Sequence, residues 1–90
     1  MDFEQFLRAA KEFDPTDRDG FGQMVFEGRC LTGQSLRQVA TELRTAPGTV
    51  SRWEAGVCAP PVVARTEIVR RFASQVRRIH ARRPVAAAVA

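Results

Sequence analysis

The sequence has few of the residue types on which metal and redox sites depend. Its 90 residues include two cysteines, Cys30 and Cys58, and one histidine, His80. The cysteines are too far apart for a CxxC site and too few for a disulfide scaffold. No cluster of His, Cys, Asp or Glu has catalytic or metal-binding spacing, and no glycine-rich phosphate loop is present. We therefore expect neither an enzyme nor a bound metal or other cofactor.

Long apolar runs are also absent. None approaches the roughly 18 residues that a membrane-spanning helix needs, so we expect a cytoplasmic protein with no membrane partner. Apolar residues make up 44% of the chain and charged residues 27%, which is the composition of a folded globular domain. This length supports one core. We expect a single domain over residues 1–84 and a flexible tail at 85–90, where only alanine and valine occur.

Lysine is nearly absent. Lys11 is the only one, and apart from His80, which is counted as neutral, every other basic side chain is an arginine. The charge is unevenly distributed. Residues 1–29 hold seven acidic and four basic side chains, whereas residues 30–90 hold three acidic side chains and ten arginines. Arginine binds phosphate and guanine edges bidentately, so this basic half favours a nucleic-acid partner. A solvated basic face is the alternative on charge alone.

The spacing of apolar residues predicts an all-α fold that begins with a helix over 2–13. Phe3, Phe6 and Phe13 lie on one face of this helix, which we expect to end at Asp14-Pro15, with a polar turn over Asp17–Gly20. This phenylalanine face packs either against the chain's own core or against a protein partner.

Residues 21–31 have a weaker helical pattern, because Gly22 and Gly28 each cost up to about 1 kcal/mol inside a helix. We favour a helix here, and a short strand at Val25–Phe26 is the alternative.

The clearest helix signals lie at residues 35–43. Ser35 and Gln38 have the pattern of a capping box, and four apolar residues follow at helical spacing: Leu36, Val39, Ala40 and Leu43. A second helix is predicted from Pro47, a residue suited to the first helical position, and Gly56 is typical of the C-terminal end.

A long helix is predicted over 62–82, since no helix breaker appears before Pro84. Its apolar stripe is Val62, Ile68, Val69, Phe72, Val76 and Ile79. Its opposite face holds Arg70, Arg71, Arg77 and Arg78. That face is either a second nucleic-acid surface or the solvated side of an amphipathic helix, and His80 is expected to be solvated.

Helices 35–43 and 47–55, joined by Arg44-Thr45-Ala46, form a predicted helix-turn-helix. Ala40 is small enough for the helices to cross, and Val50 fills the corner between them. The stretch from Gln34 to Gly56, with its Thr-Val-Ser-Arg-Trp-Glu-x-Gly run, resembles the Cro/phage-repressor (XRE-type) helix-turn-helix family over about residues 21–72. The resemblance implies a compact lambda-repressor-like domain, here with an extra N-terminal helix and a long basic C-terminal helix.

The resemblance implies that helix 47–55 reads the major groove. The residues that would contact bases are Pro47, Gly48, Thr49 and Arg52. The residues that would contact phosphates are Ser35, Arg37 and Ser51.

The resemblance also implies an ion pair between Arg29 and Glu54 behind the reading helix, the alternative being two unrelated surface charges. The sequence departs from the family's pattern in the turn. Arg44 replaces a common glycine and would need a left-handed backbone. Ala46 replaces a hydroxyl cap, so Thr45 is expected to cap the helix one residue earlier.

These features together predict a sequence-specific DNA-binding transcriptional regulator such as a repressor, bacterial or phage-encoded and nucleoid-associated. Its partner would be double-stranded DNA, bound by a homodimer at two half-sites. Two alternatives stay open. One is a helix-turn-helix module for protein interaction, an anti-activator or antitoxin that binds its partner through Phe3, Phe6 and Phe13. The other is an accessory DNA-binding factor in phage or plasmid recombination.

Overall fold

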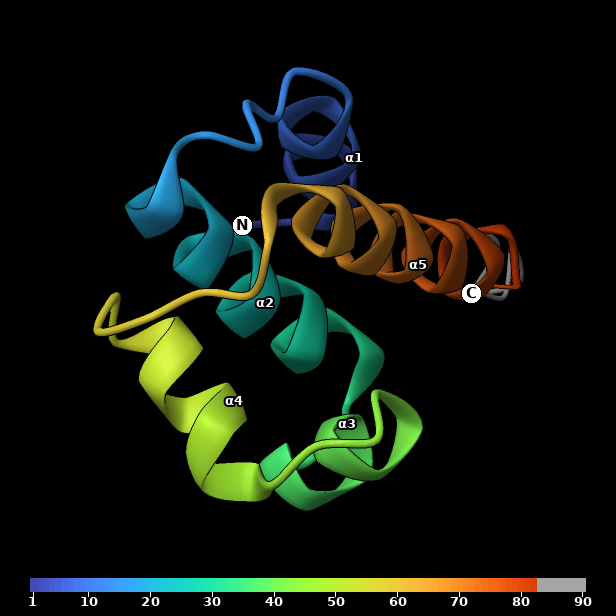
Figure 1. Ribbon diagram of the computed structural model, residues 1–90. Helices are drawn as coiled ribbons and strands as arrows, with labels where there is room; N and C mark the ends of the chain where they lie inside the picture. The colour runs from blue at the N-terminus through green and yellow to red at the C-terminus, as the bar shows by residue number, and fades with distance from the viewer. Residues whose placement is uncertain (83–90) are drawn as a thin grey trace.

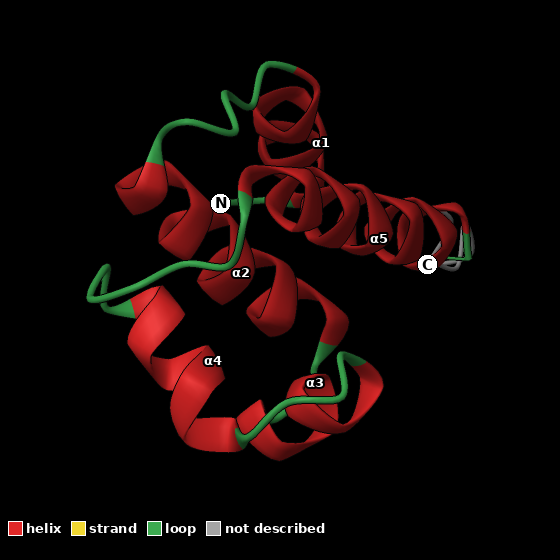
Figure 2. Ribbon diagram, in the orientation of Figure 1, coloured by secondary structure: helices red, strands yellow, loops and turns green. Residues whose placement is uncertain are grey.

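A computed structural model of the chain describes residues 1–82, which form an all-α globule (Figures 1 and 2). The helices in this range are α1 (Phe3–Lys11), α2 (Arg18–Thr32), α3 (Leu36–Glu42), α4 (Pro47–Glu54) and α5 (Val62–Ala81). The described residues contain no strand, so the alternative of a strand at Val25–Phe26 is wrong. The tail expected at 85–90 lies outside the described residues.

Helix α2 is the centre of the packing, because α1, α4 and α5 all lie against it (Figure 1). The two glycines that weaken its helical propensity stand at two of these contacts. A Cβ atom at Gly22 would collide with the carbonyl oxygen of Trp53 in α4, and one at Gly28 would lie 2.8 Å from the ring of Phe72 in α5. The helix predicted for residues 21–31 is confirmed, and both glycines permit close helix crossings.

Helix α2 starts earlier than the sequence predicted. The Asp17 carboxylate accepts a hydrogen bond of 2.9 Å from the backbone N–H of Gly20, so Asp17 caps a helix that begins at Arg18. The polar turn predicted over Asp17–Gly20 is therefore wrong after Asp17, because that side chain satisfies one of the free N–H groups of the first turn.

The phenylalanine face of α1 packs inside the chain itself. Phe6 is completely buried, and the ring centroid of Phe13 lies 6.4 Å from that of Phe21. Phe3 lies against His80, with 5.3 Å between the ring centroids, and His80 is half-buried. The expectation of a solvated His80 is thus wrong. The face packs against the chain's own core, with Phe6 at its centre.

All five helices of the described range contribute to one core, whose fully buried large side chains are Phe6, Phe21, Val25, Val39, Val50 and Val76. The apolar stripe of α5 is shorter than predicted. Val62 is 44% exposed, and the buried positions on α5 start at Ile68. The first turn of α5 is held instead by Arg65, whose guanidinium donates to the carbonyl oxygens of Pro60 at 2.7 Å and Pro15 at 2.8 Å. Within residues 1–82, no helix has both the length and the apolar character to cross a bilayer.

Candidate nucleic-acid interface

Helices α3 and α4 form the expected pair of short helices around a tight turn. The backbone N–H of Gln38 donates to Ser35 Oγ at 3.1 Å, and the backbone N–H of Ser35 donates to Gln38 Oε1 at 2.7 Å. This reciprocal capping box fixes the start of α3. After α3, Arg44 has a φ of 56°, the left-handed conformation expected for this position. The backbone N–H of Thr45 then donates to the carbonyl oxygen of Ala40 at 2.8 Å.

The start of α4 lacks a side-chain cap. Ala46 is the N-cap residue and its methyl group cannot accept a hydrogen bond. The expectation that Thr45 caps this helix is wrong, because the helix begins at Pro47 and Thr45 stands one position too early. The positive end of the α4 dipole is therefore not compensated by any side-chain oxygen of the described residues, which favours an external anion there.

The inner side of α4 is anchored in the core. Val50 is completely buried and Trp53 is 7% exposed. Trp53 packs edge-on against Phe21, with the ring centroids 5.8 Å apart. Since Gly22 brings the backbone of α2 directly against that of Trp53, α4 has little freedom to tilt.

The expected ion pair between Arg29 and Glu54 is present. Arg29 Nε donates to Glu54 Oε2 at 2.8 Å and Arg29 Nη2 donates to Oε1 at 3.1 Å. The two side chains are only 18% and 12% exposed. Hydrogen bonding to Glu54 raises the pKa of Arg29, so the guanidinium stays charged at any accessible pH. This two-pronged contact joins the last turn of α2 to the last turn of α4 and fixes the direction of α4.

The outer side of α4 is open. Pro47, Gly48 and Arg52 are exposed and Thr49 is half-buried. Arg52 Nη2 donates to Thr49 Oγ1 at 3.3 Å, and a Cβ atom at Gly48 would lie 3.6 Å from Arg52 Nη1. The guanidinium therefore lies along the first turn of α4, which brings the predicted base-contacting residues together in one place.

The predicted phosphate-contacting residues are all exposed on α4 or at the start of its neighbour α3. Ser35 and Arg37 are exposed at the start of α3, and Ser51 is exposed on α4. The oxygen of Ser35 accepts the capping hydrogen bond, so its hydroxyl proton is available to an external acceptor. Arg44, exposed in the turn, was not among the predicted contacts. Its positive charge and its place between the two helices are the signals by which the sequence could have added it to the predicted phosphate contacts. Residues 43–53 contain no acidic side chain that would neutralise it.

Comparison with protein-family models, curated proteins and solved structures finds no match for this chain. Among residues 1–82, no three His, Cys, Asp or Glu side chains gather where a metal ion could bind. The candidate site is therefore defined by its own geometry: a short helix anchored on its inner side, whose exposed side carries Arg52 and no carboxylate and whose N-terminal end has no side-chain cap.

Proposed function

We propose that the chain is a sequence-specific DNA-binding protein of the helix-turn-helix type that places α4 in the major groove. The observation that carries this proposal is the two-sided character of α4. Val50, Trp53 and the Arg29–Glu54 pair hold its inner side, whereas Arg52 is exposed on its outer side, where it contacts the half-buried Thr49.

The dimensions of α4 suit this role. Eight residues make a helix about 12 Å long, and the major groove, about 12 Å wide, admits an α-helix. The planar guanidinium of Arg52 can donate two hydrogen bonds to the O6 and N7 atoms of guanine. The Thr49 hydroxyl, which now accepts from Arg52, can contact a base edge or a thymine methyl group. Pro47 and Gly48 have no polar side-chain atoms, so they allow close approach and Arg52 supplies most of the base discrimination.

Contacts to the DNA backbone would set the position of α4 in the groove. Ser35 and Arg37 at the start of α3, with Ser51 on α4, are exposed and supply hydroxyl and guanidinium donors for such contacts. Such contacts to phosphate carry affinity and register but no sequence information.

One small reading helix contacts few base pairs, so we propose that a homodimer binds two half-sites about 34 Å apart, one turn of DNA. Binding of this kind at a promoter regulates transcription. The dimer and the regulatory role rest on the proposed DNA binding.

The test starts from a random pool of duplex DNA, from which the sequences bound by the protein are selected. Dissociation constants are then compared for the selected and a scrambled duplex. Arg52→Ala is expected to lose about 1–3 kcal/mol of discrimination, the value of a bidentate guanine contact. Arg18→Ala, which removes an exposed arginine from the first turn of α2, is the matched control and should leave discrimination unchanged. If no sequence is enriched, or if Arg52→Ala keeps the full preference, the proposal is wrong.

A further inference from the structure

The outer face of α5 carries more positive charge than its surroundings neutralise. We define the arginine face as Arg70, Arg71, Arg77, Arg78 and Arg82, all of which are exposed. Arg70 pairs with Glu67 at 3.4 Å, and Arg71 lies 3.9 Å from Glu42 of α3. These pairs involve side chains 35–72% exposed, where solvent weakens them. Arg77, Arg78 and Arg82 form no ion pair with any described residue.

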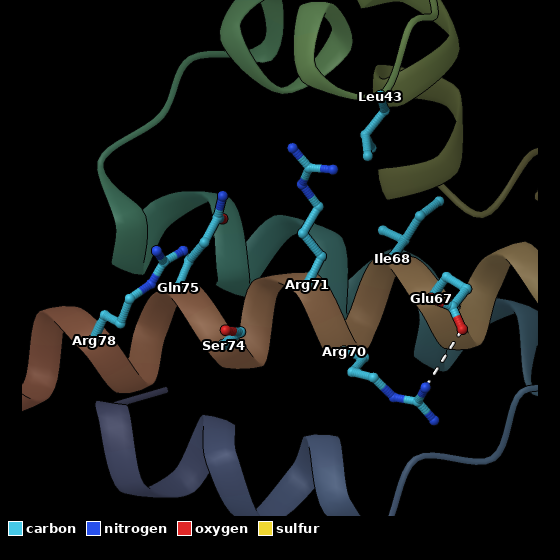
Figure 3. A pocket seen from close by; sticks show the side chains of 8 residues that line it. All are labelled: Leu43, Glu67, Ile68, Arg70, Arg71, Ser74, Gln75 and Arg78. Atoms are coloured by element: carbon cyan, nitrogen blue, oxygen red, sulfur yellow. Dashed lines mark hydrogen bonds and ion pairs between the residues drawn. The ribbon is translucent and has the colours of Figure 1, made fainter.

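The arginines are arranged in a regular pattern along the helix. Arg70 and Arg71 are followed seven residues later by Arg77 and Arg78, which is about 10 Å along the axis. The small side chain of Ser74 lies between them. Figure 3 shows Arg71, Gln75 and Arg78 directed from α5 toward the end of α3, with Leu43 facing them across an open groove of about 420 Å³. Arg70 also borders this groove, but its side chain is directed away from Leu43 and is joined to Glu67 (Figure 3).

The chemistry of this face fits a phosphate backbone better than a protein. Protein interfaces have an apolar or aromatic centre, and the arginine face has no exposed apolar or aromatic residue at its centre, where Ser74 stands. Recognition of unpaired bases depends on stacking against aromatic rings, which this face also lacks. Arginine guanidinium groups repeated along a straight helix match the repeated phosphates of a duplex.

The helices that carry the arginine face and the open side of α4 lie on different sides of α2. Helices α4 and α5 both pack against α2, and Figure 1 shows them on different sides of it. Arg52 and the arginine face are both exposed, so neither surface is covered by the described residues.

We propose that the arginine face of α5 binds the phosphate backbone of a second DNA duplex, without sequence preference, so that one molecule holds two duplexes together. The bridging rests on the function proposed for α4, whereas the binding by α5 itself does not.

The binding by α5 is tested through its salt dependence, with an Arg52→Ala protein and a duplex of unselected sequence. Each phosphate contact contributes about 0.9 to the slope of log affinity against log salt concentration. When R77Q and R78Q are introduced into this Arg52→Ala protein, the magnitude of the salt slope is expected to fall by about 2. Adding R8Q and R18Q instead removes the same charge from exposed positions on α1 and α2 and should leave the slope nearly unchanged. Equal slopes for the two double changes would overturn the proposal.

Bridging is tested with a selected duplex fixed to beads and a labelled, unselected duplex in solution. The wild-type protein should retain the labelled duplex, and R77Q/R78Q should retain at least fivefold less while still binding the beads. Circular dichroism should show the same unfolding temperature for both proteins, since these arginines are exposed. Unchanged retention by R77Q/R78Q would overturn the proposal, because that result is expected if a dimer bridges the two duplexes through its two α4 helices. The Arg52→Ala protein is also tested with duplex RNA of the same length, and stronger binding to the RNA than to the DNA would overturn the proposal as well. If only the α4 function fails, sequence preference is absent but the effect of R77Q/R78Q on the salt slope remains.

Discussion

At the scale of single residues, Gly22 decides how closely α2 and α4 approach. A Cβ atom there would meet the carbonyl oxygen of Trp53, which belongs to the backbone and cannot rotate away. Gly22→Ala should therefore lower the free energy of unfolding by about 2 kcal/mol, because the cost of overpacking exceeds the gain of up to about 1 kcal/mol in helix propensity. Urea denaturation measures this change. Gly48→Ala is the matched control, since its Cβ would make only an ordinary contact of 3.6 Å with Arg52. An equal loss in both variants would contradict the explanation.

The Arg29–Glu54 pair is the second decisive feature at this scale. Glu54 stands at the C-terminal end of α4, where the helix dipole disfavours a negative charge, and Arg29 compensates it. Glu54→Gln should cost about 2 kcal/mol of stability, between the values for exposed and fully buried pairs. A double-mutant cycle with Arg29→Met should give a coupling energy of about 1–2 kcal/mol. The exposed pair Arg70–Glu67 is the control, and a comparable coupling energy there would contradict the special role of Arg29.

Asp14 gives the chain a local response to acid. Its carboxylate accepts hydrogen bonds from the backbone N–H of Thr16 at 3.0 Å and from the Thr16 hydroxyl at 2.7 Å. These bonds lower the pKa of Asp14 below its ordinary value, the backbone bond having the larger effect. Since the pKa is lower in the folded protein, the stabilisation is complete above the unfolded pKa and is lost as the pH falls through the folded one. Thr16→Val should move the carboxyl titration, followed by NMR, to higher pH. A midpoint that stays in place would show that the hydroxyl has no effect.

At the scale of elements, α3 and α4 begin in opposite ways. A complete capping box starts α3, whereas Ala46 leaves α4 uncapped. Ala46→Ser should raise the free energy of unfolding by about 0.5–1 kcal/mol, because a hydroxyl accepts from the free N–H groups of the first turn. Ser35→Ala should lower it by about 1 kcal/mol for the opposite reason. Thermal unfolding of the two variants checks both signs. No gain from Ala46→Ser would show that the turn through Arg44 does not let residue 46 cap the helix.

At the scale of the whole molecule, α1 closes the core that α2 and α5 leave open. Its contribution is concentrated in Phe6, which is completely buried. Phe6→Ala should lower the free energy of unfolding by about 3–5 kcal/mol, measured by chemical denaturation. Phe26→Ala removes the same atoms from a side chain that is 42% exposed and should cost about 1 kcal/mol or less. Similar losses in the two variants would mean that α1 does not complete the core.

The fold could be predicted from the sequence wherever local signals agree with one another. Spacing of apolar residues and the Ser35–Gln38 pattern correctly placed α3, and Pro47 correctly marked the start of α4. Local signals did not predict the burial or the packing partner of a residue where these depend on tertiary contacts. Val62 has the right spacing for the α5 stripe, yet it is exposed. The partner of His80, the ring of Phe3, is distant in the sequence and so was not predictable from its neighbours.

The same division holds for the candidate site. The residue order by itself determined that α4 exists and that it carries Arg52 near Thr49, since these depend on backbone preferences over a few positions. The left-handed conformation of Arg44 was expected only from the resemblance, because arginine by itself does not favour it. Only the tertiary structure decided that Gly22 and Gly28 are crossing points, that the phenylalanine face of α1 packs against the chain's own core, and that α4 and α5 lie on different sides of α2. The reason is physical: a helix forms from interactions within one or two turns, whereas its orientation depends on which distant side chains fill the space between it and its neighbours.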